Sequence, residues 1–179
     1  PAIGKTYCQL ASGKKNEVDM AVAAAQKAQK SWGSTSQDER CKLLNALADG
    51  IEKRFDEFAL AESIDNGKPL WLTKAMDIPR AISNLRFFGN AITQFSSEAH
   101  ETVGANAINY TLRQPIGVVA CISPWNLPLY LFTWKIAPAL AAGNAVIAKP
   151  SEVTPLTAFL LSQVCIEAGF PPGVLNIIH

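Results

Sequence analysis

The chain has 179 residues, of which 49% are apolar and 17% charged, with 16 basic and 15 acidic side chains. This composition is too apolar and too weakly charged for a disordered chain, and a net charge of +1 gives nucleic-acid binding no electrostatic support. The longest apolar stretch, residues 136–148, is interrupted by Pro138 and Gly143 and is too short to cross a bilayer. No basic-then-apolar leader pattern opens the chain, so we expect a cytoplasmic protein without a membrane or nucleic-acid partner.

Candidate metal ligands and redox groups are few and scattered: Cys8, Cys41, Cys121, Cys165, His100 and His179. The cysteines lie far apart, without the spacing of a metal site or a redox pair, and the histidines have no ligand spacing. A free cysteine behaves as a small hydrophobe. We therefore expect reduced and mostly buried thiols, and no bound metal.

Apolar residues at spacings of three and four predict two helices in the first part of the chain. The first covers residues 14–32. The second begins at Ser36 with a capping box, in which the Ser36 hydroxyl accepts from the backbone N–H of Glu39 while the Glu39 side chain reaches back. Gly67 is typical of the residue that ends such a helix. The core stripe of this second helix is Leu43, Leu47, Ile51, Phe55 and Phe58.

A third helical pattern covers residues 70–95, and Pro79 inside it should kink the helix because proline lacks a backbone N–H. Farther along, residues 107–113 alternate by two, as a half-buried strand does. Gly104 upstream allows a turn. These features predict either a hairpin or an extended arm.

The last third of the chain alternates between buried strands and helices. Thr154 and Pro155 are typical of the first residues of a helix, with the Thr154 hydroxyl as its cap. Right-handed crossovers would place both helices on one face of a parallel sheet, so the other face needs cover from elsewhere, and we expect the chain to be part of a longer protein. The fold class is α/β, with a helical N-terminal part followed by half of a Rossmann-like parallel sheet. The predicted strands cover residues 117–122, 145–148 and 174–178, and the predicted helices cover 129–142 and 154–168.

Two loops follow the carboxyl ends of predicted strands, at residues 123–126 and 149–152, and both carry polar side chains. In an open parallel sheet, ligands bind beyond these strand ends. No Gly-x-Gly-x-x-Gly or Walker motif follows either strand, so a nucleotide site here would lack the usual glycine fingerprint. Spacing alone reveals no pair of nucleophile and base.

At these loops the sequence resembles the NAD(P)-dependent aldehyde dehydrogenase superfamily in the order and spacing of its motifs. These motifs are PIGV at 115–118, ISPWNLP at 122–128, WKIAPALAAGN at 134–144 and KPSEVTP at 149–155. Within the superfamily, MDIPR at 76–80 and NLRFF at 84–88 are similar to the branch that contains 2-aminomuconic and 2-hydroxymuconic semialdehyde dehydrogenases.

The resemblance implies an N-terminal segment of an enzyme that oxidises an aldehyde to a carboxylic acid. In that family a cysteine thiolate adds to the carbonyl, a hydride leaves to NAD, and water cleaves the thioester. The implied parts are helical (1–102), a β arm for oligomerisation (103–115) and a first βαβαβ half of the NAD-binding domain (116–179). The catalytic cysteine and general-base glutamate have no match here, and Cys121 lies in a buried strand, where a thiol is inert. The chain alone should therefore be inactive.

For the first loop, the resemblance assigns the oxyanion-hole amide to Asn126, and it places Ser123, Pro124 and Trp125 along the cofactor cleft. An amide is a suitable donor because it carries no charge that would neutralise the thiolate. The alternative is that Asn126 only bonds its own loop.

For the second loop, Lys149 matches the lysine that bonds the adenosine ribose, and Glu152 matches the residue that accepts from the ribose hydroxyls. Pro150 and Ser151 complete this cofactor-binding segment. A carboxylate at this position favours NAD because it would repel a 2′-phosphate. The alternative is that Lys149 and Glu152 form a solvated ion pair.

Four further residues match positions near the substrate. Lys135 matches a lysine that assists proton movement, and Tyr130 and Trp134 match positions that line the aldehyde tunnel. Arg80 also matches a tunnel position, where a guanidinium could bind the distant carboxylate of a muconic-type semialdehyde. The alternatives are a helix-surface lysine, two core aromatic residues and a solvated arginine.

Two functions therefore remain open. The chain is either the N-terminal piece of a working dehydrogenase for a small aldehyde, active as a homodimer or homotetramer, or a truncated, non-catalytic module for cofactor binding or assembly.

Overall fold

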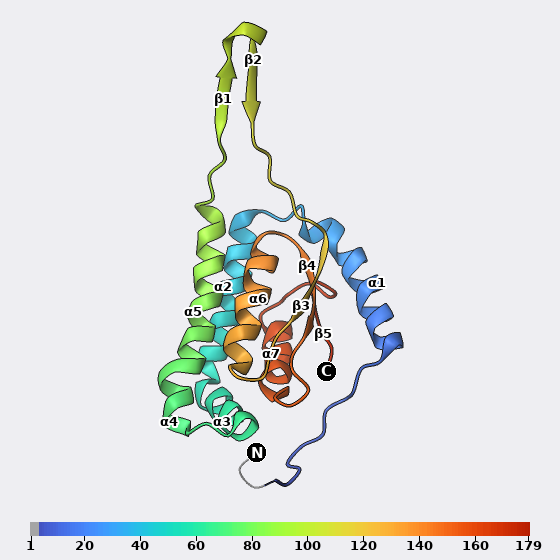
Figure 1. Ribbon diagram of the computed structural model, residues 1–179, viewed down its shortest axis with the longest axis vertical. Coiled ribbons are helices and arrows are strands. Elements are labelled where there is room, and N and C mark those ends of the chain that lie inside the picture. Colours follow the sequence, from blue (N-terminus) through green and yellow to red (C-terminus); the bar gives the residue numbers. More distant parts are fainter. Residues whose placement is uncertain (1–3) are drawn as a thin grey trace.

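Three parallel strands lie between two layers of helices in the computed structural model, which describes residues 4–179 (Figure 1). The helices α6 (Pro128–Ala141) and α7 (Leu156–Glu167) pack on one face of the sheet, and α1 (Lys15–Trp32) packs on the other. The predicted α/β fold is thereby confirmed. The first three residues of the predicted helical part lie outside the described residues. In sheet order, the strands are β3 (Val118–Ile122), β4 (Ala145–Lys149) and β5 (Leu175–Ile177).

Helix α1 supplies the cover that the second face of the sheet needs. It packs chiefly over β4, the central strand, whose Val146 and Ala148 are fully buried. The sequence predicted that the strand at 117–122 is buried on both faces, and this is wrong for β3, in which Ile122 is 67% exposed. The reason is the strand order, which places β3 at an edge of the sheet, where cover is incomplete.

The second predicted helix is in fact two helices, α2 (Gln37–Lys53) and α3 (Phe55–Asn66). Arg54 leaves the helical conformation between them, with φ −105° and ψ 24°. Its guanidinium pairs with Glu57 at 2.7 Å and lies 5.9 Å from the centre of the Phe58 ring. The pattern of spacings continues across this break, so periodicity could not reveal it.

The predicted ends of these two helices are largely confirmed. Ser36 accepts from the backbone N–H of Glu39 at 3.2 Å, which caps α2. The Glu39 carboxylate lies 3.7 Å from the ammonium of Lys42 and does not complete the expected capping box. Gly67 ends α3 in the left-handed conformation, with φ 83°.

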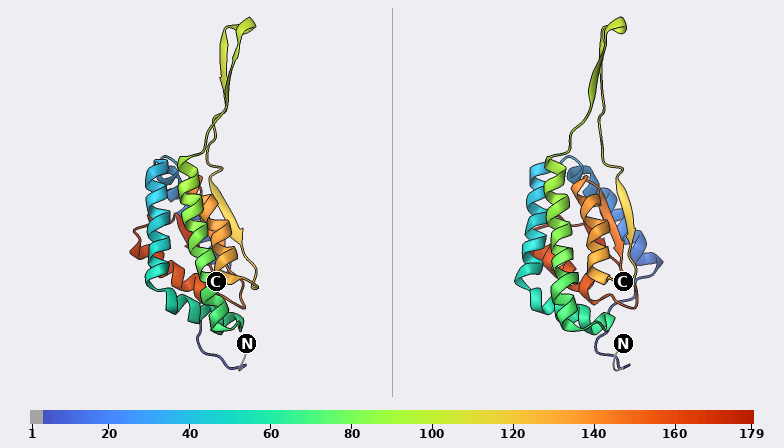
Figure 2. Two further views of the ribbon diagram at one scale, coloured as in Figure 1. Left: turned by 90° about the vertical axis from the view of Figure 1, so that its left-hand side faces the viewer. Right: turned by 60° about the vertical axis from the view of Figure 1, so that its left-hand side comes forward.

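The third predicted helix is interrupted just before its proline. It consists of α4 (Leu70–Leu72), a π-helical turn η1 (Thr73–Asp77) and α5 (Ile78–Thr93). The Ile78 N–H reaches back five residues to the carbonyl of Thr73. The predicted helix is therefore interrupted by this wider turn, and the missing donor of Pro79 falls at the start of α5. Figure 2 shows α5 side by side with α2 and α6, and it packs against both.

A two-stranded hairpin connects α5 to the sheet and projects beyond the rest of the molecule (Figure 1). Its strands, β1 (Ala99–Thr102) and β2 (Ala107–Tyr110), pair antiparallel. The hairpin alternative is therefore confirmed, although it begins at Ala99 and every residue of both strands is exposed, not half-buried. The turn η2 (Val103–Ala105) contains Gly104, but the residue with positive φ is Asn106, at 48°.

Two glycines near the carboxyl end of the chain provide a test of how closely α1 packs. Gly173 and Gly169 both have positive φ, at 85° and 80°. A Cβ at Gly173 would lie 2.6 Å from the carbonyl oxygen of Ala24 on α1, whereas a Cβ at Gly169 would meet nothing within 4 Å. Gly169→Ala should therefore cost about 1–2 kcal/mol for its backbone conformation, and Gly173→Ala about 1 kcal/mol more for the clash.

The measurement is urea denaturation of both variants, followed by tryptophan fluorescence; of the four tryptophans, Trp32 is 1% exposed and packs 5.9 Å from the Phe170 ring. Equal losses of unfolding free energy in the two variants would show that α1 does not press on the turn at Gly173.

Candidate functional site

The two polar loops predicted from the sequence lie side by side at the carboxyl ends of β3 and β4. The backbone N–H of Ser123 donates to the carbonyl of Lys149 at 3.1 Å and links the two loops. Parallel pairing of β3 with β4, which sets Ile122 opposite Lys149, brings about this contact. The hairpin projects from the opposite end of the molecule (Figure 1).

The first loop presents its polar tip to solvent. Ser123 is buried, whereas Pro124, Trp125 and Asn126 are exposed. The carbonyl of Trp125 accepts from the side-chain amide of Asn66 at the end of α3, at 2.8 Å. The structure therefore fixes the peptide bond that precedes Asn126.

In the second loop, the two charged residues contact each other. The Lys149 ammonium donates to Glu152 at 3.1 Å and to the carbonyl of Pro150 at 3.2 Å. The Glu152 backbone N–H and the Lys149 ammonium hold the pKa of Glu152 below its ordinary value, so this carboxylate is ionised at neutral pH. Pro150 and Ser151 are buried and form the base of the loop.

Both helices that follow the loops begin without a cap from their own chain segment. The N-cap residue of α6 is Leu127 and that of α7 is Pro155, neither of which has a polar side chain. The predicted cap by Thr154 is therefore wrong, and the buried Thr154 hydroxyl has no hydrogen-bond partner within residues 4–179. The prediction placed Thr154 next to the helix, but the helix begins one residue too late for its hydroxyl to act as the N-cap.

Two carboxylates of α3 provide the missing caps. Both oxygens of Glu62 accept from the backbone N–H of Leu129 in the first turn of α6, at 3.3 and 3.4 Å. Asp65 accepts from the N–H of Leu156, the first residue of α7, at 2.8 Å, and its other oxygen accepts from the Tyr7 hydroxyl. These caps come from a distant helix of the same chain, and they satisfy backbone donors that would otherwise be buried and unpaired.

Sequence reasoning missed Glu62, Asp65 and Asn66. A signal was present, because Glu62 and Asp65 continue the apolar stripe of Phe58 at spacings of four and three, which places carboxylates at core positions. Buried charged groups require partners. Burial raises the pKa of Glu62 to about 7, and hydrogen bonds from Thr157 and the Leu129 backbone oppose that rise.

The predicted substrate residues on α5 and α6 lie together. The Arg80 guanidinium lies 5.4 Å from the centre of the Tyr130 ring, and that ring is 5.8 Å from Trp134. Trp134 is 49% exposed and contacts the Phe88 ring edge-on at 5.9 Å. Asn84 of α5 donates to the carbonyl of Tyr130 at 3.1 Å. Arg80 is thus exposed, but it packs on Tyr130, the first ring of an aromatic row formed by Tyr130, Trp134 and Phe88.

The remaining candidate, Lys135, is exposed on α6. Its charge opposes the effect of burial, which raises the pKa of the Cys121 thiol. Burial also raises the pKa of Cys165 to about 12, so both thiols are protonated and inert. Cys41 is half-buried and Cys8 is exposed, so the expectation of mostly buried thiols holds for only half of them.

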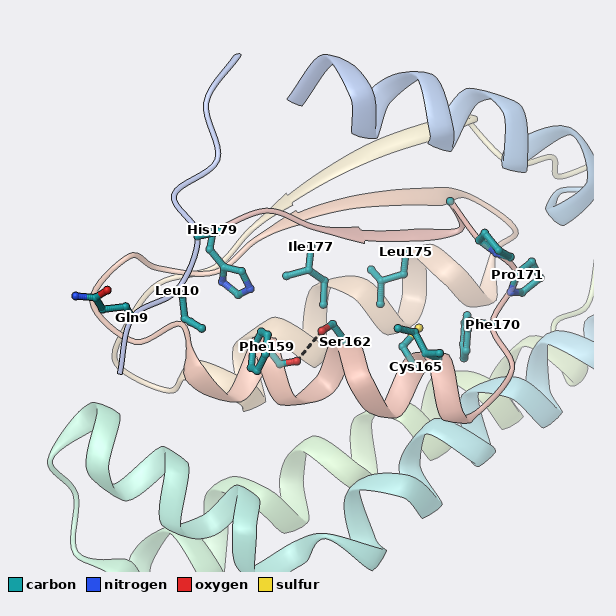
Figure 3. Close-up of a pocket in the computed structure, with 14 residues that line it drawn as sticks. Gln9, Leu10, Phe159, Ser162, Cys165, Phe170, Pro171, Leu175, Ile177 and His179 are labelled. Carbon is teal, nitrogen blue, oxygen red and sulfur yellow. Dashed lines mark hydrogen bonds between the residues drawn. The ribbon is translucent and has the colours of Figure 1, made fainter. Parts of the chain in front are cut away.

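A pocket lies away from these residues, between β5 and α7 (Figure 3). It has a volume of about 660 Å³ and a mainly apolar lining, and its one hydroxyl on α7, that of Ser162, already donates to the Phe159 carbonyl at 2.6 Å. A smaller pocket of about 360 Å³ adjoins the second loop, where Glu152, Tyr7 and His179 line it. The polar side chains of the two loops, and not the volume of a pocket, therefore locate the candidate site.

The described residues, 4–179, include no group of three or more side chains that could hold a metal ion. Within the same range, every helix is too short or too polar to cross a membrane.

Comparisons with known proteins agree with these features. The Aldehyde dehydrogenase family profile matches residues 1–179. The chain is 51% identical over 178 residues to 2-aminomuconic semialdehyde dehydrogenase of Homo sapiens, covering 99% of the chain and 37% of the human protein. It is 49% identical over 183 residues to 2-hydroxymuconic semialdehyde dehydrogenase of Pseudomonas sp. (strain CF600), covering all of the chain and 38% of that protein.

Among solved structures, an indole-3-acetaldehyde dehydrogenase in complex with NAD+ superposes with a TM-score of 0.95 at 38% identity, covering 99% of the chain and 36% of that protein. The chain therefore spans little more than a third of the length of these relatives. Two of them are muconic semialdehyde dehydrogenases, the branch that the motifs indicated. The resemblance is confirmed: the chain belongs to the aldehyde dehydrogenase family.

Proposed function

We propose that this chain is the cofactor-binding portion of an NAD-dependent dehydrogenase that oxidises a carboxylated semialdehyde to the corresponding acid. The observation that carries the proposal is the adjacency of the two loops, one carrying Asn126 and the other carrying the Lys149–Glu152 pair. The muconic semialdehyde dehydrogenases among its relatives, and a structural neighbour solved with NAD+, support the same activity.

The loops have the chemistry that a dinucleotide requires. Glu152 is ionised and exposed, so it can accept from ribose hydroxyls, and Lys149 can donate beside it. The hydroxyls of Ser123 and Thr154, at or near these loops, are buried and lack hydrogen-bond partners within residues 4–179. When bound, NAD supplies the hydride acceptor. The pocket beside Glu152 offers room for the ribose.

Asn126 is the residue that we assign to the reacting oxygen. Its exposed amide can donate a hydrogen bond to the aldehyde oxygen as that oxygen gains negative charge. Because Asn66 holds the preceding peptide, the backbone that carries this amide is held in place before substrate binds. Lys135, exposed on α6, is assigned to proton movement near the same site.

Arg80 is assigned to the carboxylate of the substrate. Tyr130 lies four residues after Asn126, and the Arg80 guanidinium packs on its ring, so a substrate whose aldehyde reaches Asn126 can extend along the aromatic row toward Arg80. The planar guanidinium can bind a carboxylate through two hydrogen bonds. Tyr130 and Trp134 would contact the carbon chain between the two ends.

The hairpin is assigned to self-association as a homodimer or homotetramer. Its apolar side chains are exposed to solvent, with Val103 at 78%, Ile108 at 74% and Tyr110 at 70%. Apolar strands with free edges at the end of an arm are typical of surfaces that pair with another chain.

Asn126→Ala in a full-length enzyme that carries this chain should lower kcat by about two orders of magnitude, because one oxyanion donor is lost. NAD binding, measured by fluorescence titration, should change little, since the cofactor contacts assigned to Glu152 and Lys149 remain. A decrease of less than about threefold, with chemistry still rate-limiting, would remove Asn126 from this role.

Arg80→Met should lower kcat/KM for a carboxylated semialdehyde roughly ten- to a hundredfold, through loss of a charge-assisted hydrogen bond. Turnover of a simple aliphatic aldehyde should be little affected. The matched control is Arg86→Met, on the same helix, whose guanidinium pairs with Asp49 and Glu52 and should affect neither substrate. Equal losses on both substrates in Arg80→Met would mean that Arg80 supports the helix and does not select the substrate.

Glu152→Gln should raise kcat/KM with NADP relative to NAD, because the amide removes the negative charge that repels a 2′-phosphate. Steady-state kinetics with each cofactor measures this ratio. A wild-type enzyme that uses both cofactors equally well would contradict the role assigned to Glu152.

A further inference from the structure

The end of α3 contacts both loops of the candidate site through three side chains in succession. Glu62, Asp65 and Asn66 occupy positions i, i+3 and i+4, which lie on one face of a helix. Each bonds a backbone group of a different segment, namely Leu129 at the start of α6, Leu156 at the start of α7, and the carbonyl of Trp125 in the first loop. None of the three is assigned a part in binding cofactor or substrate.

We propose that Asn66 and Asp65 are positioning residues for the reaction: Asn66, with Glu62, sets the loop that carries Asn126, and Asp65 sets the loop that carries Glu152. This inference rests on the proposed function. It adds that a single turn of α3 orients the two loops through separate contacts. The first loop (123–126) is called the reacting-oxygen loop below, and the second loop (149–152) is called the ribose loop.

The first of these contacts acts on the peptide next to the catalytic amide. The Asn66 amide donates to the Trp125 carbonyl at 2.8 Å, and this carbonyl belongs to the peptide bond that leads into Asn126. Glu62, which is fully buried, holds the other end of the same loop through Leu129. The loop is therefore held on both sides of Asn126.

The second contact acts on the ribose loop from its far end. Asp65 is 5% exposed and accepts from Leu156 at 2.8 Å, where the loop enters α7. The near end of that loop is held by β4, whose Lys149 carbonyl accepts from Ser123. Asp65 therefore limits how far Glu152 can move relative to the strand end.

The turn that carries these side chains is itself well supported. The Ser63 hydroxyl donates to the Lys68 carbonyl at 2.6 Å, and the Lys68 ammonium pairs with the buried Asp77 at 2.8 Å. Gly67 reverses the chain between them. A side chain on a rigid element transmits a fixed position to what it bonds.

Because the two contacts reach different loops, their removal should affect different kinetic constants. In a full-length enzyme that carries this chain, Asn66→Ala should lower kcat roughly tenfold with little change in KM for NAD, since the oxyanion donor loses its orientation. Asp65→Ala should raise KM for NAD roughly tenfold with little change in kcat, since the ribose loop loosens. Asp65→Asn keeps an acceptor oxygen for the Leu156 N–H, so its KM for NAD should lie close to the wild-type value. This variant also tests the proposal if Asp65→Ala does not fold.

Ile64→Ala is the matched control, because Ile64 lies on the same turn of α3, is 41% exposed and bonds neither loop. It should leave both kcat and KM near their wild-type values. The proposal is overturned if Asn66→Ala and Asp65→Ala change the same constant, or if Ile64→Ala reproduces either effect.

Hydrogen exchange separates this proposal from the proposed function. Asn66→Ala should speed backbone amide exchange in residues 125–129, and Asp65→Ala should speed it in 155–158, whether or not the enzyme oxidises an aldehyde. An enzyme without NAD-dependent turnover but with these two separate exchange changes would refute the activity and retain the positioning of the loops. Unchanged exchange in both variants would refute the positioning.

Discussion

The arrangement of this domain depends on two carboxylates that are buried where helices begin. Glu62 and Asp65 would each be destabilising alone in the core, and the first N–H groups of α6 and α7 would be equally unfavourable without acceptors. The carboxyl groups accept hydrogen bonds from these N–H groups, so both the acceptors and the donors are paired. Because α6 and α7 follow the two strands whose ends form the candidate site, the capping interaction also determines where those loops lie relative to the helical layer.

Most of the fold could be predicted from local pattern. Helices α1, α6 and α7 and the three parallel strands could be predicted from local sequence, because each contains one stripe or one run of apolar residues. The break at Arg54 and the π-helical turn before Pro79 could not, since neither interrupts the spacing of apolar residues. The exposure of β3 depends on strand order and on where α1 packs, and both are long-range properties.

The site was predicted in its parts but not in its support. Motifs indicated Asn126, Lys149 and Glu152, and the structure places their loops next to each other. For Arg80 a solvated side chain was the alternative to a tunnel position; it is exposed, and its guanidinium lies 5.4 Å from the centre of the Tyr130 ring on α6. The α3 contacts were missed because they join residues 59 to 91 positions apart, beyond the reach of any local pattern.

The capped helix ends also have a consequence for the recognition of phosphate. In many nucleotide-binding folds, a helix N-terminus after a strand attracts the phosphate through its partial positive charge. Here Asp65 and Glu62 place carboxyl groups at the N-termini of α7 and α6, and each accepts from one backbone N–H in the first turn of its helix. A phosphate at this face would find one N–H of each helix start already paired within the chain, and neither loop has the glycine-rich turn that permits a close backbone approach.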